Sequence, residues 1–324
     1  MTATPLDSGK VAFDRIAQVR ILVIGDIMLD VDRVGEATRI SPEAPVPVLL
    51  NPRTEYRLGG AGAVAAMCAA LGARVILIGV LGQDSSGIAV RTIVGSASVH
   101  LQAAIDPFRP TTTKERICGV SGGRHRQQLG RLDAECTDCI SGDTETLICD
   151  TITDQLAALP DVIIVSDYGK GVCTEEVISR VRTSGLPVIV DPPKNSNWIS
   201  DYFGVTCVVP NRYESDGCTA SQLRPHVYAD AVIVKLDEDG CDVAVRDPAS
   251  NADISITAKI PSRARAVHDV TSAGDQFIAT LACARAAGMD WIAAAELANQ
   301  AAGLQVERHG CQPVTAQELE LVNS

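Results

Sequence analysis

DVTSAGD, residues 269–275, is the most informative stretch of this 324-residue chain. Small residues precede an acid, and a helical pattern, Gln276 to Ala287, follows directly. A turn of small residues that opens a helix leaves backbone N–H groups unpaired at the positive end of the helix dipole. Such a turn binds anions, and phosphate above all. The stretch therefore predicts a phosphate-binding turn.

Asp275 is unusual beside an anion site, because its carboxylate would repel the ligand. It has a purpose there if it takes a proton from the group that attacks the phosphate. An anion-binding turn with an adjacent base is the minimal equipment for phosphoryl transfer to a hydroxyl. The alternative is structural, because Asp is also favoured in the first turn of a helix by the dipole. The stretch by itself leaves both interpretations open.

The composition predicts a core built from Ala, Val, Ile and Leu, since 46% of residues are apolar and only 3% aromatic. The length suits one large domain or two smaller ones. Lys and Arg number 28 and Asp and Glu 40, a formal net charge of −12. This balance argues against a nucleic-acid or membrane partner, which would need a basic surface. An anionic small substrate needs only a local cationic pocket.

No segment suggests secretion or membrane insertion. Met1 to Lys10 has no apolar core, and the longest uncharged stretch, Gly59 to Ala73, is shorter than the ~20 residues of a membrane span. We therefore expect a cytoplasmic protein. The eleven cysteines are scattered and odd in number, which argues against a disulfide framework. Cys136 and Cys139 form the only CxxC pair, which alone is weak as a zinc site.

Short apolar runs alternate with helical patterns along most of the chain, and after Asp269 the pattern is purely helical. The runs are β-branched and lack the alternation of a half-exposed sheet. They predict a mostly parallel sheet with helices on both faces. The expected strands are 21–25, 75–81, 162–166, 188–190, 207–209 and 232–236, and the expected helices include 61–71, 143–159 and 174–184.

Two segments break this alternation. Residues 32–57 hold four prolines and many charges, and residues 108–133 are rich in Thr and Arg with strand-like alternation. Each follows a core strand and returns to the core, as expected of a small β-lid over a site. No linker separates independent domains, so we expect one domain over 1–324 that carries these two lid segments.

Polar residues follow nearly every expected strand. In a doubly wound sheet the ligand lies beyond the C-terminal ends of the strands. Any single such residue is a common turn former, but their repetition favours a site. They are Asp26, Asp30, the segment 82–84, Asp167 with Lys170, Asp191 with Lys194, and Asn211 with Glu214.

The stretch GAGAVA, residues 60–65, fits the GxGxxA form of a dinucleotide fingerprint and supports a rival interpretation, a nicotinamide or flavin oxidoreductase. That fingerprint requires a buried strand running straight into the first glycine. Here the polar residues 55–57 precede it, which weakens the rival. Neither a P-loop nor the protein-kinase set of motifs is present.

The chain resembles the ribokinase-like (phosphofructokinase-B) family of carbohydrate kinases over essentially its whole length. Four stretches carry the likeness: GDIMLD at 25–30, RISPEAPVPV at 39–48, SDYGKG at 166–171 and DVTSAGD at 269–275. RISPEAPVPV, with RPTTTKERI at 109–117 and QQLGRLD at 127–133, is similar to the branch that phosphorylates heptose 7-phosphate at its anomeric hydroxyl.

The resemblance implies a ribokinase-like three-layer α/β/α fold with a mostly parallel central sheet and a small β-lid. It implies ATP as the donor, Mg²⁺ as its companion and a homodimer formed through the lid, and it leaves a monovalent-cation requirement open. It makes Asp275 the base and the backbone amides of Ser272, Ala273 and Gly274 the anion hole.

The resemblance also assigns binding residues. Asn211 and Glu214 would organise Mg²⁺ through its waters, and the remaining nucleotide-binding candidates are Lys235, Gly240, Asp269, Thr271, Asn299 and Gly303. The sugar-binding candidates are Asp30, Gly59, Gly60, Ala63 and Asp167. Lys114, Arg116 and Arg131 are candidates for a distal phosphate or, alternatively, solvated lid charges. Lys170 reaches the same phosphate or only a neighbouring acid.

Three departures from the family pattern bear on the substrate. Ala63 stands where the family usually has Asn, whose amide reaches sugar hydroxyls, and Ser272 stands where it has Gly. The segment between Glu214 and Val232 is also shorter than expected. The sequence thus predicts a kinase for a heptose phosphate or a related phosphorylated sugar. A kinase for another sugar or nucleoside, or a sugar- or nucleotide-binding protein without turnover, stays open.

Overall fold

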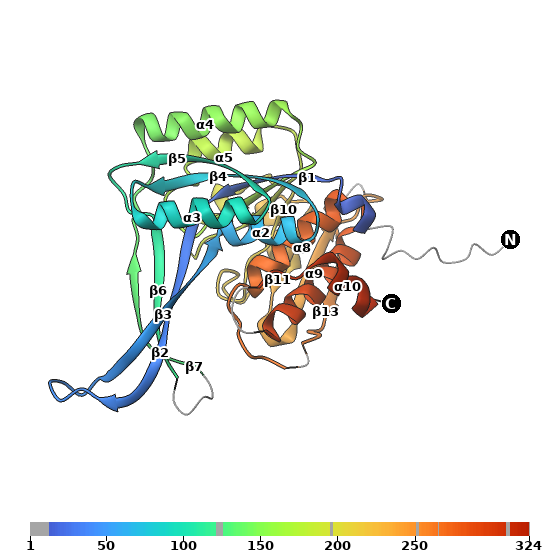
Figure 1. Ribbon diagram of the computed structural model, residues 1–324. Coiled ribbons are helices and arrows are strands. Elements are labelled where there is room, and N and C mark those ends of the chain that lie inside the picture. The colour runs from blue at the N-terminus through green and yellow to red at the C-terminus, as the bar shows by residue number, and fades with distance from the viewer. Residues whose placement is uncertain are drawn as a thin grey trace.

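A nine-stranded sheet forms the centre of the molecule in the computed structural model, which describes residues 13–120, 126–194, 197–250, 253–264, 266–308 and 312–323 (Figure 1). Its order is β13-β12-β11-β10-β9-β8-β1-β4-β5. The strands are β1 (Arg20–Gly25), β4 (Arg74–Gly82), β5 (Val99–Asp106), β8 (Val162–Ser166), β9 (Val188–Asp191), β10 (Cys207–Val208), β11 (Ala231–Lys235), β12 (Cys241–Arg246) and β13 (Ser255–Ile260).

Every neighbouring pair from β5 to β11 is parallel, which confirms the predicted sheet and its six expected strands. The antiparallel strands β12 and β13 close one edge, and the sequence pattern did not predict them. β12 contains the charged residues Asp242 and Arg246, and β13 buries only Ile260, so neither is the unbroken apolar run by which the core strands were predicted.

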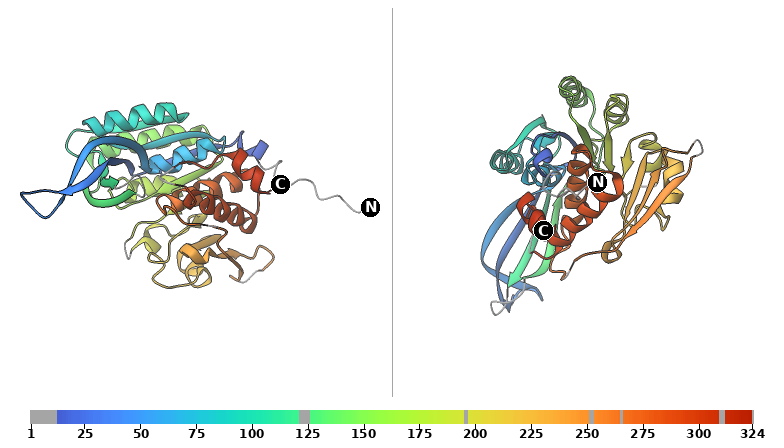
Figure 2. Two further views of the ribbon diagram at one scale, coloured as in Figure 1. Left: turned by 60° about the horizontal axis from the view of Figure 1, so that its bottom comes forward. Right: turned by 90° about the vertical axis from the view of Figure 1, so that its right-hand side faces the viewer.

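Helices cover both faces of this sheet because each core strand is apolar on both sides (Figure 2). In β1, Ile21 and Val23 belong to one core and Leu22 and Ile24 to the other. The first face carries α2 (Ala61–Ala70), α3 (Ser85–Ser96), α8 (Ala273–Ala286), α9 (Trp291–Val306) and α10 (Ala316–Asn323), and the second carries α4 (Gly142–Ala157), α5 (Glu175–Arg182), α6 (Trp198–Asp201) and α7 (Ala220–Val227).

The three expected helices are confirmed as α2, α4 and α5, each ending one or two residues earlier than the sequence pattern predicts. The short segment after Glu214 holds a single eight-residue helix, α7, which begins with a capping box between Thr219 and Gln222. No helix in the described ranges is long and apolar enough to cross a lipid bilayer.

A second, four-stranded sheet projects away from the main one (Figure 1). Its order is β3-β2-β6-β7, with β2 (Ile27–Ile40), β3 (Pro47–Gly60), β6 (Thr112–Val120) and β7 (Arg126–Ala134). The segments expected to form a lid lie in this sheet, although β2 and β3 extend beyond 32–57 toward the core. The first residues of β2 are buried and its last are exposed, so only the base of this lid sheet packs on the body.

The junction between the two sheets is fixed at Gly25 and Asp26. A Cβ atom on Gly25 would lie 2.0 Å from the carbonyl oxygen of Ser166, and its φ of +151° suits glycine. The buried Asp26 carboxylate accepts hydrogen bonds at 2.8 to 3.3 Å from the backbone N–H groups of Tyr168, Lys170 and Val172. Asp26 thereby holds the SDYGKG loop at the carboxyl edge of the sheet.

The glycine-rich stretch follows a strand of the lid sheet, not a strand of the parallel sheet. Gly60 ends β3 with a φ of +55°, and a Cβ there would lie 2.3 Å from the carbonyl oxygen of Asp26. Helix α2 starts at the next residue. In a dinucleotide fingerprint the strand belongs to the parallel sheet, so this topology argues against the oxidoreductase interpretation.

Candidate active site

A cavity of about 550 Å³ opens at the carboxyl ends of β8, β9 and β11, beside the base of the lid sheet. It brings together the predicted residues Lys114, Arg131, Asp167, Lys170, Asn211, Glu214, Lys235, Ser272, Gly274 and Asp275. A slightly larger hollow of about 600 Å³ lies between α3, β5 and α4, and no comparable convergence of charged side chains lines it. The first cavity is therefore the candidate active site.

The start of helix α8 supplies free backbone N–H groups to this cavity. Ser272 adopts a left-handed conformation with a φ of +63°, which turns the chain into the helix. In the described part of the chain, the N–H groups of Ser272 and Gly274 have no acceptor, whereas that of Ala273 is 3.4 Å from the Val270 carbonyl oxygen. These free N–H groups at a helix N-terminus form an anion-binding turn.

Asp275, in the first turn of α8, is buried at the inner end of the cavity. The phenol of Tyr168 donates a hydrogen bond to one of its carboxylate oxygens. Burial, aided by the nearby Asp191, outweighs the lowering by Tyr168, Ser272 and Lys235, and the net effect raises the pKa of Asp275 to about 6. A carboxylate in this state is ionised at neutral pH and basic enough to accept a proton.

Lys235, at the end of β11, places a positive charge beside the anion-binding turn. Its Nζ lies 2.6 Å from Asp191, and a Cβ on Gly274 would lie 3.4 Å from that Nζ. Burial lowers the pKa of Lys235, but Asp191, Glu214 and Asp275 outweigh this effect and the net pKa is raised. The ammonium group thus stays charged next to the amides.

Asn211 and Glu214 are hydrogen-bonded to each other at the cavity wall. Glu214 accepts hydrogen bonds from the Asn211 backbone N–H at 2.7 Å and its side-chain amide at 2.6 Å. Burial, followed by the repulsion from Asp191, raises the pKa of Glu214. A carboxylate buried beside a second acid suits a divalent cation, and carboxylate and amide oxygens are ligands that Mg²⁺ accepts.

No group of three or more His, Cys, Asp or Glu side chains in the described ranges is arranged to hold a metal ion by itself. Mg²⁺ commonly binds through few protein ligands, with waters and substrate phosphates filling its shell. The residues around Glu214 therefore fit Mg²⁺ held through water, as the sequence predicts.

Most predicted phosphate-binding cations of the lid are already paired with acids. Arg116 lies 3.1 Å from Asp30, Arg131 lies 2.8 Å from Asp133, and Lys170 lies 2.8 Å from Glu135. Lys114 differs, because its Nζ lies over the ring of Tyr168, 5.4 Å from the ring centre. Of the two alternatives for Lys170, the structure has the contact with a neighbouring acid.

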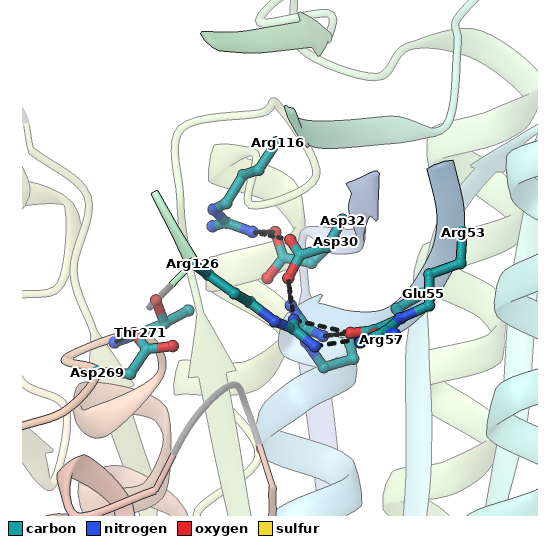
Figure 3. A network of polar contacts seen from close by, with 9 residues as sticks. All are labelled: Asp30, Asp32, Arg53, Glu55, Arg57, Arg116, Arg126, Asp269 and Thr271. Atoms are coloured by element: carbon teal, nitrogen blue, oxygen red, sulfur yellow. Dashed lines mark hydrogen bonds and ion pairs between the residues drawn. The ribbon is translucent and has the colours of Figure 1, made fainter. Parts of the chain in front are cut away.

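The lid base carries a continuous network of charges (Figure 3). Arg57 donates to Asp32, and Arg126 makes two hydrogen bonds of 2.9 Å to Glu55. The guanidinium group of Arg126 lowers the pKa of Glu55. Arg116 lies between Asp30 and Asp32, and a Cβ on Gly59 would be 3.3 Å from the Asp30 carboxylate. Gly59 therefore leaves room for Asp30.

Other predicted residues lie outside the cavity lining. Gly60 and Ala63 are buried at the start of α2. Gly240, directly before β12, lies against Ile260, and Asp269 accepts from the Thr271 N–H at 2.9 Å. On α9, Asn299 donates to the Pro261 carbonyl at 2.8 Å, and a Cβ on Gly303 would be 3.2 Å from the Ala264 nitrogen.

Two residues of the site had no predicted role: Tyr168 was not singled out, and Asp191 was expected only as one of the polar residues that follow the strands. Tyr168 contacts the base, and Asp191 holds Lys235. Both had a sequence signal, since Tyr168 lies in SDYGKG and Asp191 directly follows an apolar strand. Nothing in the sequence showed which side chain each would contact.

An anion-binding helix N-terminus with a buried carboxylate at the edge of a parallel sheet defines a phosphoryl-transfer enzyme. The chain matches the pfkB family of carbohydrate kinases over residues 18–318 and belongs to that family. It is therefore a carbohydrate kinase, with ATP as the expected phosphate donor of the family.

Two relatives are similar in sequence to this chain over most of its length. The chain is 38% identical to D-beta-D-heptose 7-phosphate kinase from Bordetella bronchiseptica, over 94% of this chain and 96% of that protein. It is 37% identical to the bifunctional protein HldE from Geotalea uraniireducens, over 95% of this chain but only 63% of that protein. The chain thus spans less than two thirds of the bifunctional relative.

Solved structures confirm the ribokinase-like α/β fold. Ribokinase from Arabidopsis thaliana, complexed with ribose and ATP, matches with a TM-score of 0.68 at 19% identity, over 94% of this chain and 98% of that one. Phosphofructokinase-2 from Escherichia coli, in complex with potassium, matches with a TM-score of 0.73 at 15% identity, over 94% and 98% of the two chains.

The raised pKa of Asp275 predicts that Asp275→Asn stabilises the protein at pH 8. Because the folded state binds the proton more tightly than the unfolded state, wild-type stability rises as pH falls from about 6 to about 4. A shift of this size corresponds to roughly 2–3 kcal/mol. Urea unfolding at pH 4 to 8 should show the variant more stable by this amount at pH 8 and equal near pH 4.

Asp14→Asn, which changes an exposed acid, is the matched control and should leave the difference curve flat. If the wild type and Asp275→Asn have the same stability at every pH, the ionised Asp275 carboxylate does not destabilise the folded protein, and the prediction is wrong.

Proposed function

We propose that this protein transfers the terminal phosphoryl group of ATP to a hydroxyl of a heptose phosphate or a related phosphorylated sugar. The observation that carries the proposal is the buried Asp275 carboxylate beside the free amides of Ser272 and Gly274 in one cavity. The similarity to heptose 7-phosphate kinase supports the substrate class. The proposed compartment is the cytoplasm, where ATP is available.

In the proposed reaction, Asp275 takes the proton of the sugar hydroxyl as that oxygen bonds to the terminal phosphorus of ATP. The bond from this phosphorus to the bridging oxygen breaks, and ADP leaves with the electron pair. The amides of Ser272 and Gly274 receive the charge on the transferring group, with Lys235 beside them. Most of the acceleration is expected from positioning and charge neutralisation.

Asn211 and Glu214 are the proposed outer ligands of Mg²⁺. When bound, this ion would neutralise charge on the phosphate oxygens of ATP. The adenosine end of ATP is proposed to lie along Asn299 and Gly303, where α9 approaches segment 261–264 closely.

The distal phosphate of the sugar is proposed to bind Lys114 and Lys194. Five cationic side chains line the cavity: Lys114, Arg131, Lys170, Lys194 and Lys235. Three of them are in ion pairs with Asp133, Glu135 and Asp191. Within the described residues, Lys114 and Lys194 have no carboxylate partner within 4.0 Å. Free ammonium groups of this kind are suited to a phosphate dianion.

Purified protein should release ADP in a coupled assay with at least one phosphorylated sugar, and Asp275→Asn should abolish this turnover. The loss of a general base typically costs 10²–10⁴-fold. Nucleotide affinity, measured by calorimetry, should be kept, since Asn preserves the shape of the side chain.

A panel of heptose phosphates, hexose phosphates, free sugars and nucleosides distinguishes the remaining alternatives. Turnover only with unphosphorylated sugars or nucleosides would show that the acceptor is not a phosphorylated sugar. Tight sugar or nucleotide binding with no turnover on any acceptor would show a binding protein and refute the proposal.

Lys114→Ala should raise KM for the sugar phosphate by about 10- to 100-fold and leave KM for ATP unchanged, because a charge-assisted hydrogen bond to the distal phosphate is lost. Lys259→Ala, on the exposed strand β13, is the control. If both variants keep the wild-type KM for the sugar phosphate, the distal phosphate binds elsewhere.

We also propose that two copies associate through their lid sheets. This sheet and the turn between β2 and β3 expose large apolar side chains, namely Ile40, Val46, Tyr56, Leu129 and Leu132. Light scattering should give about twice 34.1 kDa for the wild type. The double change Ile40→Glu and Leu129→Glu should halve this mass, because charges would be buried in the interface. A wild-type monomer would refute the association.

A further inference from the structure

Tyr168 is the one side chain of the SDYGKG loop that contacts the proposed base. Its phenol donates to Oδ1 of Asp275. The loop itself is fastened by Asp26, which accepts the Tyr168 backbone N–H at 2.8 Å. Tyr168 is therefore held at its backbone and at its hydroxyl.

Tyr168 remains a donor over the whole working pH range. Burial, followed by the repulsion from Asp275 and Asp191, raises the pKa of its phenol well above the ordinary value. The ammonium group of Lys114 lies 5.4 Å from the ring centre, a cation–π contact that holds the ring in place. A neutral, fixed phenol can orient a carboxylate without competing for its proton.

Ser272 adds a second interaction that is particular to this chain. Its side chain lies beside the Asp275 carboxylate and contributes to lowering the pKa of Asp275, less strongly than Tyr168 does. The residue has a φ of +63°, which glycine adopts without strain and serine does not. The chain thus keeps a strained serine beside the base.

We propose that Tyr168, assisted by the Ser272 hydroxyl, is a positioning residue that fixes Asp275 so that its second carboxylate oxygen faces the sugar hydroxyl. This inference rests on the proposed function. A base held within hydrogen-bond reach and in one orientation is what proton abstraction requires. A carboxylate free to rotate would lose this alignment.

The charged and polar groups that face Asp275 come from every element around it. They are Tyr168 after β8, Asp191 at the end of β9, Glu214 after β10, Lys235 at the end of β11, Lys114 on β6 and Ser272 before α8. Only Tyr168 and Ser272 are changed in the test. The contributions of the other groups to the pH profile therefore cancel between variants.

The test is steady-state kinetics from pH 5 to 9, with the sugar phosphate that the wild type converts. Tyr168→Phe should lower the plateau kcat by about 10- to 100-fold and leave KM within about 2-fold. It should also move the acid limb up by about one pH unit, because the lost hydrogen bond favoured the ionised carboxylate. Tyr228→Phe, at a half-exposed tyrosine remote from the cavity, should behave as the wild type.

Comparing Ser272→Ala with Ser272→Gly separates the effect of losing the hydroxyl from the effect of relieving the backbone strain. Both should move the acid limb in the same direction as Tyr168→Phe, with a smaller, about 2- to 5-fold, loss of kcat. Only Ser272→Gly should raise Tm, by about 2 °C, because it also removes the backbone strain. If Tyr168→Phe does not fold, Ser272→Ala carries the test.

The inference fails if Tyr168→Phe, or in its place Ser272→Ala, keeps the wild-type plateau and acid limb, or if only KM changes. The proposed function fails differently, since the wild type itself would then convert no sugar phosphate.

Discussion

The in-register parallel pairing of β1, β8 and β9 is the constraint on which the site depends. Gly25 pairs with Ser166, and Ser166 pairs with Asp191, so the three strands end at one level. The next residues of β1 and β8, Asp26 and Asp167, therefore emerge at the same edge as Asp191. A bulkier residue than glycine at position 25 would collide with the Ser166 carbonyl oxygen and separate the strands.

This level edge concentrates negative charge, and each carboxylate is compensated in a different way. Asp26 accepts three backbone N–H groups, and Asp191 has the Lys235 ammonium. Asp167 accepts the Tyr202 phenol at 2.5 Å, and burial raises its pKa to about 6. Asp275 likewise accepts from a phenol, that of Tyr168, and forms no ion pair among the described residues, so burial raises its pKa to about 6 as well. Of these two basic carboxylates, Asp275 is the one beside the anion-binding turn. The apolar cores on both sides of the sheet offset this cost.

In the lid sheet, by contrast, positive and negative charges are largely paired, because acids of the same sheet neutralise its arginines. Arg57, Arg116 and Arg126 lie within one network with Asp30, Asp32 and Glu55 (Figure 3). Such a network orders the lid base without making it strongly cationic. Recognition of an anionic sugar then falls to the few ammonium groups left free in the cavity, which fits a protein whose net charge is −12.

The sequence by itself determined the parallel sheet, its main helices and the anion-binding turn, because unbroken apolar runs and a small-residue helix start are local signals. It did not reveal β12 and β13, because neither is an unbroken apolar run. It also could not tell free lid cations from paired ones, since Arg116 and Asp30 lie far apart along the chain and meet only through strand register. The contact of Tyr168 with Asp275 joins residues 107 positions apart. Only the tertiary structure decided it, because such a contact follows from where strands end in space and leaves no local pattern.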